Sequence, residues 1–290
     1  MSMGIKNQIL SLYIETGLSP YTKERNFQVS YTINLENPTS NPQVTKVIAP
    51  LPANLFDLQF YPENASIKKE EKFLNTYILW QVELKPKEKK NLVTTYKITS
   101  MPSIFKSKKI SFSNEVNPNT PENIKSIIQE LPVTNNPYEY LSLVNQYIQK
   151  NLSYGDPVTG LYSTTDAISR SKVDCGGYSS LFIALCKAVN IKAELLLGFW
   201  LDKKAKEPMH AWVEVEIDNE KFQVDPTINQ LFKLGRANHY SRLGLIPSDR
   251  VIVSTGSDLI IEGEKIKILQ HPHLDNKNIT QSLTFHSKTL

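Results

Sequence analysis

Three residues of this chain, Cys175, His210 and Asp225, are of the types that carry out nucleophilic catalysis together. The reactive form of cysteine is the thiolate, yet a free thiol with a pKa of about 8.5 is mostly protonated at neutral pH. A histidine can take the thiol proton, and a carboxylate can fix the tautomer of that histidine. The set predicts that the Cys175 thiolate is a nucleophile and that His210 is the base that takes its proton.

The position of Cys175 in a predicted helix strengthens this interpretation. Apolar residues recur at helical spacing between Tyr178 and Val189, which predicts a helix that opens at Asp174 or Cys175. The sulfur would then lie among unpaired backbone N–H groups at the positive end of the helix dipole, where a thiolate is stabilised. The chain has two cysteines, too few for a disulfide framework or a four-cysteine zinc site. The second, Cys186, would lie about 16 Å further along the helix, in the core.

The neighbours of Cys175 have two interpretations. Asp174 is a candidate helix cap, and Gly176 and Gly177 would leave the sulfur without bulky neighbours and let a substrate backbone approach. These glycines are therefore predicted to belong to a substrate cleft. The alternative is that Cys175 is a small apolar residue at a helix start, without a chemical role.

His210 opens a predicted strand, Met209 to Ile217, whose alternation places His210 and Trp212 on one face. Trp212 is a candidate wall of the substrate cleft, or else a packed aromatic. A turn centred on residues 218–221 would place Asp225 opposite Glu214, on the face of His210 but roughly 13 Å from it. Contact between the two would need a tighter turn or a bulge.

The elements around these residues indicate an α+β chain of two domains. The first third alternates with period two, as in Asn26 to Glu36, which predicts an N-terminal antiparallel β-sandwich. Prolines then introduce helical patterns, one starting at Pro121 and one from Pro137 to Lys150, and strand-like segments return after residue 193. We expect a sandwich domain over residues 1–112 and a catalytic domain over 113–290.

Four blocks in order along the chain resemble the transglutaminase-like superfamily, in particular bacterial members with an N-terminal β domain. They are Val173 to Phe182 (VDCGGYSSLF), Leu185 to Glu194, His210 to Val215 (HAWVEV) and Val224 to Thr227 (VDPT). The resemblance spans roughly residues 140–240. It implies a papain-like core of helices packed on an antiparallel sheet. It also implies that Cys175 is the nucleophile, His210 the base and Asp225 the group that orients the base.

The resemblance leaves the oxyanion donor open. The backbone N–H of Cys175 is one donor. Tyr154 and Tyr162 are side-chain candidates, and each has the alternative role of a packing aromatic.

These observations predict a cysteine peptidase or amidase that acts on peptides or proteins. Water resolves the thioester in that reaction, whereas an amine acceptor would make the enzyme a transglutaminase. Hydrolysis is favoured because many short bacterial relatives look like peptidases and no calcium-type loop is evident. The alternative from another class is a non-catalytic binding module on the same fold. No cofactor or metal is expected.

The charge composition indicates which classes of binding partner to expect. The net charge of +4 comes from 33 Lys and Arg against 29 Asp and Glu, which gives no signature for nucleic acid or membrane surfaces. The only feature that favours nucleic-acid binding is the positive charge of the first 110 residues. The segment Met1 to Pro20 lacks the apolar core of a signal peptide, so we expect a cytoplasmic location. The oligomeric state is left open.

Overall fold

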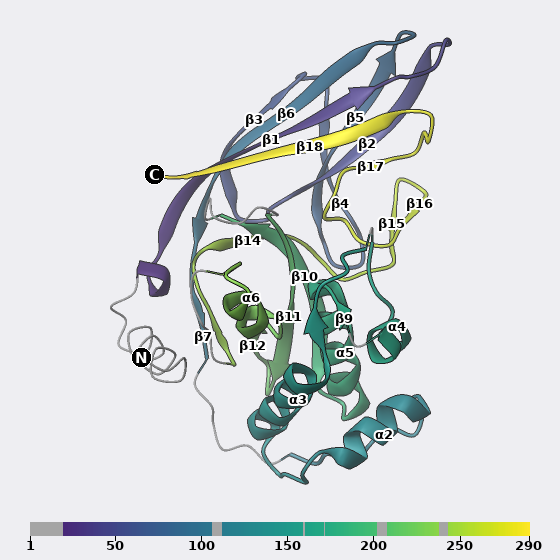
Figure 1. Cartoon of the computed structure of the whole chain (residues 1–290). Coiled ribbons are helices and arrows are strands. Elements are labelled where there is room, and N and C mark those ends of the chain that lie inside the picture. Colours follow the sequence, from purple (N-terminus) through teal and green to yellow (C-terminus); the bar gives the residue numbers. More distant parts are fainter. Residues whose placement is uncertain (1–19, 106–111, 159, 171, 202–207, 238–242) are drawn as a thin grey trace. The chain divides into compact units, whose positions relative to one another are not determined.

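The computed structural model describes residues 20–105, 112–158, 160–170, 172–201, 208–237 and 243–290 (Figure 1). The chain forms two compact units. We call residues 20–23, 102–196 and 210–248 the core unit. Residues 24–101, 197–209 and 249–290 form the sandwich unit. Residues 1–19, which carry most of the argument against a signal peptide, lie outside the described residues.

The sandwich unit contains two four-stranded sheets whose facing sides share one apolar core. Along β1 every second residue from Phe27 to Leu35 is buried, as the alternation predicts. The first sheet has the order β18-β1-β6-β3: Thr280–Thr289, Arg25–Glu36, Lys89–Ser100 and Leu55–Tyr61. The second has the order β17-β2-β5-β4: His273–Leu274, Gln43–Leu51, Thr76–Leu84 and Ser66–Lys69. This unit also holds β14 (Arg250–Thr255) and the hairpin β15 (Leu259–Ile261) and β16 (Glu264–Ile266).

The division of the chain differs from the expected 1–112 and 113–290. Strand β18 pairs antiparallel with β1 over ten residues, and β17 pairs with β2, so the C-terminal segment completes the N-terminal sheets. Pairing with β18 satisfies backbone groups that an open edge of β1 would leave exposed. Within β18 only Ser287 is buried and Leu283 and Phe285 are half-buried, so the apolar alternation of this strand is short.

The core unit places its helices around α5 (Cys175–Ala188), which packs against α2 (Glu122–Glu130), α3 (Pro137–Asn151) and α4 (Thr164–Arg170) (Figure 1). The apolar cluster of this unit joins the helices to strands β11 (Met209–Ile217) and β12 (Glu220–Val224). These strands lie in a four-stranded sheet with the order β12-β11-β10-β14, where β10 is Lys192–Trp200. The expected α+β class is therefore confirmed.

Shorter elements complete the core unit. Helix α3 begins at Pro137, as predicted, and the Asn136 side chain caps it by accepting from two backbone N–H groups. The remaining elements are η1 (Pro20–Thr22), β7 (Ser103–Ile104) paired with β13 (Leu245–Ile246), β8 (Ser153–Tyr154) paired in parallel with β9 (Lys172–Val173), and α6 (Ile228–Lys233). Among the described residues, none of the helices is long and apolar enough to cross a bilayer.

Candidate active site

Cys175 is the first residue of α5, as the sequence pattern predicts. Asp174 caps the helix, because its Oδ1 accepts from the Gly177 backbone N–H at 3.2 Å and its Oδ2 accepts from that of Val158 at 3.2 Å. Cys175 is partly accessible to solvent, whereas Cys186 is completely buried in the core of the same unit. The two cysteines therefore occupy the different environments that their places in the helix predict.

Gly176 and Gly177 are buried by the protein itself. A Cβ on Gly177 would lie 2.6 Å from the Cβ of Val173, and one on Gly176 would lie 2.9 Å from Cδ1 of Leu161. The glycines allow β9 and residue 161 to approach the first turn of α5 closely. The space expected for a substrate backbone at these two positions is thus filled by neighbouring residues of the chain.

A tight turn sets the register between β11 and β12. Asp218 and Asn219 form it, with φ values of 53° and 61°, which is the conformation of a two-residue hairpin turn that Asp and Asn tolerate. Glu214 consequently pairs with Gln223, and the expectation that Asp225 lies opposite Glu214 is wrong. Continuing the register brings Asp225 two residues closer to His210 than the wider turn would allow.

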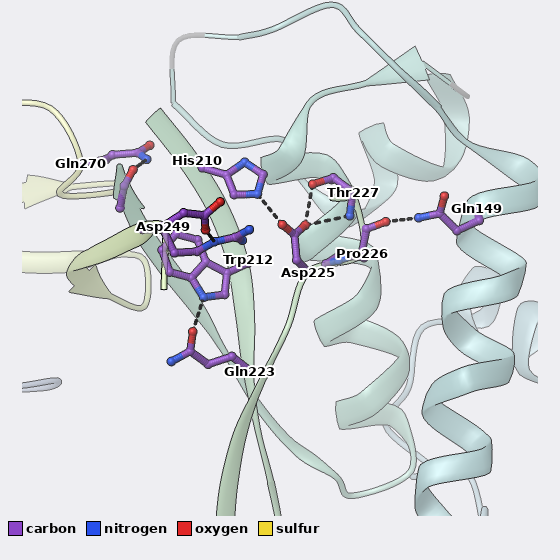
Figure 2. A network of polar contacts seen from close by, with 11 residues as sticks. Gln149, His210, Trp212, Gln223, Asp225, Pro226, Thr227, Asp249 and Gln270 are labelled. Atoms are coloured by element: carbon purple, nitrogen blue, oxygen red, sulfur yellow. Dashed lines mark hydrogen bonds and ion pairs between the residues drawn. The ribbon is translucent and has the colours of Figure 1, made fainter. Parts of the chain in front are cut away.

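His210 and Asp225 are in direct contact. The Nε2 of His210 lies 2.7 Å from Oδ2 of Asp225, and the exposed fractions of the two side chains are 1% and 0% (Figure 2). Thr227 donates to the other carboxylate oxygen, Oδ1, from its backbone N–H at 2.9 Å and from its hydroxyl at 2.6 Å. Because Nε2 donates its proton to Asp225, Nδ1 is the ring nitrogen suited to accept one.

The backbone N–H of Ala211, the residue after His210 in β11, hydrogen-bonds to the sulfur of Cys175. Burial, together with the carboxylates of Asp174 and Asp225, raises the pKa of Cys175 to about 12, although hydrogen bonds from the Ala211 backbone N–H and the Tyr154 hydroxyl lower it. The expectation that the helix start gives Cys175 a low pKa is therefore not met. A thiol whose pKa is raised in this way needs a base when it attacks.

The two tyrosine candidates have different surroundings. The hydroxyl of Tyr154, in β8, hydrogen-bonds to Cys175, and burial together with that neighbour raises the pKa of Tyr154. Tyr162 is buried against Gly177, and its hydroxyl donates to the Asp156 carbonyl at 2.5 Å. The structure thus brings Tyr154 to the sulfur and engages Tyr162 elsewhere.

The ring of Trp212 stacks against the ring of His210. Its side chain is fully buried, its ring plane is within 20° of the His210 ring at a centroid distance of 5.8 Å, and its Nε1–H donates to Oε1 of Gln223 at 2.9 Å (Figure 2). We expected Trp212 at a substrate cleft, but complete burial gives it the role of a packed aromatic. Gln223 was not identified from sequence, although it lies two residues before Asp225 on the same strand.

A second residue missed by sequence reasoning is Gln149 of α3. Its side-chain amide donates to the carbonyl of Pro226, between Asp225 and Thr227 (Figure 2). Helix α3 thereby holds the loop that carries the carboxylate. No sequence signal distinguishes Gln149 from other polar residues of this helix, because the contact depends on tertiary packing.

The raised pKa of Cys175 makes a prediction about stability in alkali. Above about pH 8.5 the unfolded thiol loses its proton, while the folded thiol keeps it up to about pH 12. The unfolded state then binds fewer protons, so stability falls as the pH rises. We expect a contribution of about 1 kcal/mol or less per pH unit, since partial exposure reduces the limiting slope.

Urea unfolding at pH 8 and pH 10 measures this effect. Wild type should lose more stability over the interval than Cys175→Ala, which lacks the thiol. Both proteins keep Cys186, whose pKa burial also raises, so its contribution cancels. Equal losses in the two proteins would contradict the raised pKa of Cys175.

Comparisons with known proteins found one family match and several similar solved structures. Residues 125–226 match the model of the transglutaminase-like superfamily, which confirms the resemblance of the four sequence blocks. The solved structure described as a "putative cysteine protease" from Cytophaga hutchinsonii is similar with a TM-score of 0.62 and 16% identity, over 92% of this chain and 91% of that one. The periplasmic domain of TgpA from Pseudomonas aeruginosa, bound to ethylmercury, is similar over 75% of this chain and 94% of that one, at 14% identity and a TM-score of 0.31. None of the curated proteins matches this chain.

Proposed function

We propose that this chain, with its transglutaminase-like core, is a cysteine-dependent acyl-transfer enzyme that hydrolyses amide bonds of peptides or proteins. The observation that carries the proposal is the buried contact between His210 and Asp225, 2.7 Å long, at the start of β11, where the Ala211 backbone N–H bonds the sulfur of Cys175. The family match and the shared fold support the same class of chemistry.

In the proposed mechanism His210 acts first as a base and then as an acid. His210 Nδ1 takes the proton of Cys175 as the sulfur bonds to the carbonyl carbon, and Asp225 stabilises the imidazolium that forms. The imidazolium then protonates the amine as the carbon–nitrogen bond breaks, which leaves a thioester. Water attacks the thioester with His210 again as base, and the acid and the free thiol are released.

We assign two groups to stabilise the oxyanion of the tetrahedral intermediate. One is the backbone N–H of Cys175, at the start of α5, and the other is the hydroxyl of Tyr154 beside the sulfur. The assignment of Tyr154 can be tested with a matched control. Tyrosine-to-phenylalanine substitution removes a single hydroxyl at Tyr154 and at Tyr162.

We expect Tyr154→Phe to lower kcat by about 10-fold to 10³-fold, because one oxyanion donor is lost. Tyr162→Phe should change kcat by less than about threefold, because its hydroxyl bonds the Asp156 carbonyl instead. Steady-state rates of both variants on the same peptide make the comparison. Equal effects of the two substitutions would remove Tyr154 from this role.

The function itself is tested by incubating wild type and Cys175→Ser with casein and a primary amine, followed by mass spectrometry. Hydrolysis predicts new peptide termini with wild type and none with Cys175→Ser. Incorporation of the amine at glutamine side chains would assign the chain to the transglutaminases instead. If the chain is a non-catalytic binding module, neither product should form. Iodoacetamide should then label Cys175 at the same rate in wild type and in His210→Ala.

A further inference from the structure

Arg236 is an exposed cation whose backbone position is fixed by the end of α6. The helix closes with two hydrogen bonds, from Gly235 N–H to the Phe232 carbonyl at 3.0 Å and from Arg236 N–H to the Leu231 carbonyl at 2.8 Å. Gly235 has a φ of 67°, so this is the left-handed helix cap that glycine favours. The loop of Asp225 leads directly into α6, and the cap turns the chain back at Arg236.

The cap brings Arg236 to the candidate active site. Helix α6 packs against β8, and the guanidinium carbon of Arg236 lies 5.8 Å from the ring centroid of Tyr154, within the range of a cation–π contact. The hydroxyl of that ring hydrogen-bonds to Cys175. The guanidinium therefore lies within about 13 Å of the sulfur, given ordinary hydrogen-bond lengths. An extended peptide covers this distance in about four residues.

The charge of Arg236 has no carboxylate partner in the part of the chain that the structure describes. The carboxylates closest to the sulfur, Asp174 and Asp225, are buried and occupied by backbone, hydroxyl and imidazole groups. A guanidinium offers paired N–H donors that match a carboxylate. The tyrosine ring restricts where that group points, which lowers the entropy lost on binding a ligand.

We propose that Arg236 is a specificity-determining residue that binds a carboxylate of the acyl donor, within about four residues of the bond that is attacked. The preferred substrates are then acidic peptides or protein segments. This inference rests on the proposed function, because it assigns a substrate class to the same site.

The first test needs no natural substrate. Iodoacetate and iodoacetamide alkylate the Cys175 sulfur by the same displacement of iodide, but only iodoacetate carries a negative charge. At an ionic strength of about 0.01 M, where screening over this separation is weak, we expect the iodoacetate-to-iodoacetamide rate ratio to fall about threefold in Arg236→Gln and about tenfold in Arg236→Glu. Lys233→Gln is the matched control, an exposed cation on the last turn of α6, and its ratio should equal that of wild type.

The second test uses peptides that copy a site cleaved in casein, with glutamate or glutamine at each of the four positions on either side. We expect wild type to prefer glutamate at one of these positions by about tenfold in kcat/KM, and Arg236→Gln to lose that preference. Arg236→Lys should keep part of it, because lysine retains the charge without the paired donors.

The possible outcomes distinguish failure of the role of Arg236 from failure of the proposed function. An unchanged alkylation ratio in Arg236→Gln, together with the absence of any glutamate preference in wild type, overturns the role of Arg236 while cleavage by Cys175 continues. A Cys175 whose reactivity is independent of His210, in a protein that cleaves nothing, overturns the proposed function and this inference together.

Discussion

Replacing His210 with alanine is expected to lower kcat for amide-bond cleavage by about 10⁴-fold or more. Because burial raises the pKa of Cys175 to about 12, few Cys175 side chains are thiolates at pH 7.5. Wild type overcomes this scarcity by moving the proton to His210 during attack. Losses of this size are typical when one member of a catalytic triad is removed.

The pH dependence of the residual rate distinguishes loss of the base from loss of structure. Without His210, the rate should rise about tenfold per pH unit above pH 7.5, because it follows the thiolate fraction. Wild type should not show this rise. Single-turnover rates between pH 6.5 and 9.5 measure both profiles, and circular dichroism checks that the variant is folded.

His286→Ala supplies the control, since His286 is an exposed histidine of β18 in the sandwich unit. Its rate and pH profile should match those of wild type. If His210→Ala keeps more than a tenth of the wild-type rate with an unchanged profile, His210 is not the base.

The local parts of the site were predictable from sequence. The start of α5 follows from the helical spacing after Cys175, and β11 follows from the alternation after His210. These signals depend on residues within one element. They place the thiol and the imidazole at the ends of their elements without any knowledge of how the elements pack.

The contact between His210 and Asp225 depends on a turn that the sequence did not determine. A four-residue turn and the observed two-residue turn at Asp218 and Asn219 both fit the polar segment after Ile217. The choice shifts the partner strand by two residues, or about 6.6 Å, without changing the face of any side chain. Alternation therefore predicted the shared face correctly and the distance wrongly.

Tertiary burial explains the other differences. The helix-dipole argument for Cys175 is local, whereas its pKa is dominated by burial, which depends on the whole core unit. The pairing of β18 with β1 joins residues about 250 positions apart in sequence, so no local pattern reveals it. The same holds for Gln149 and the Pro226 carbonyl.

Replacing Asp225 with asparagine is expected to lower kcat by about 10²-fold to 10⁴-fold while KM changes little. Thr227 donates two hydrogen bonds to Oδ1, so the asparagine carbonyl oxygen should occupy that place. The amide NH₂ then faces Nε2 of His210 and makes that nitrogen an acceptor. The imidazole proton moves to Nδ1, and the ring can no longer accept a proton from Cys175.

This explanation predicts a second-site effect. Adding Thr227→Val to Asp225→Asn removes one of the two donors that fix the amide, so a fraction of molecules can rotate the carbonyl oxygen toward Nε2. In the double variant we expect a partial recovery of kcat, about threefold to tenfold. Thr227→Val alone should instead lower kcat or lower the free energy of unfolding by about 1–3 kcal/mol, because a buried hydrogen bond is lost. The ¹⁵N chemical shifts of His210 report which ring nitrogen carries the proton in each variant. If Asp225→Asn retains the wild-type tautomer, or if the double variant is slower than Asp225→Asn, then Asp225 acts through charge alone and Thr227 does not orient it.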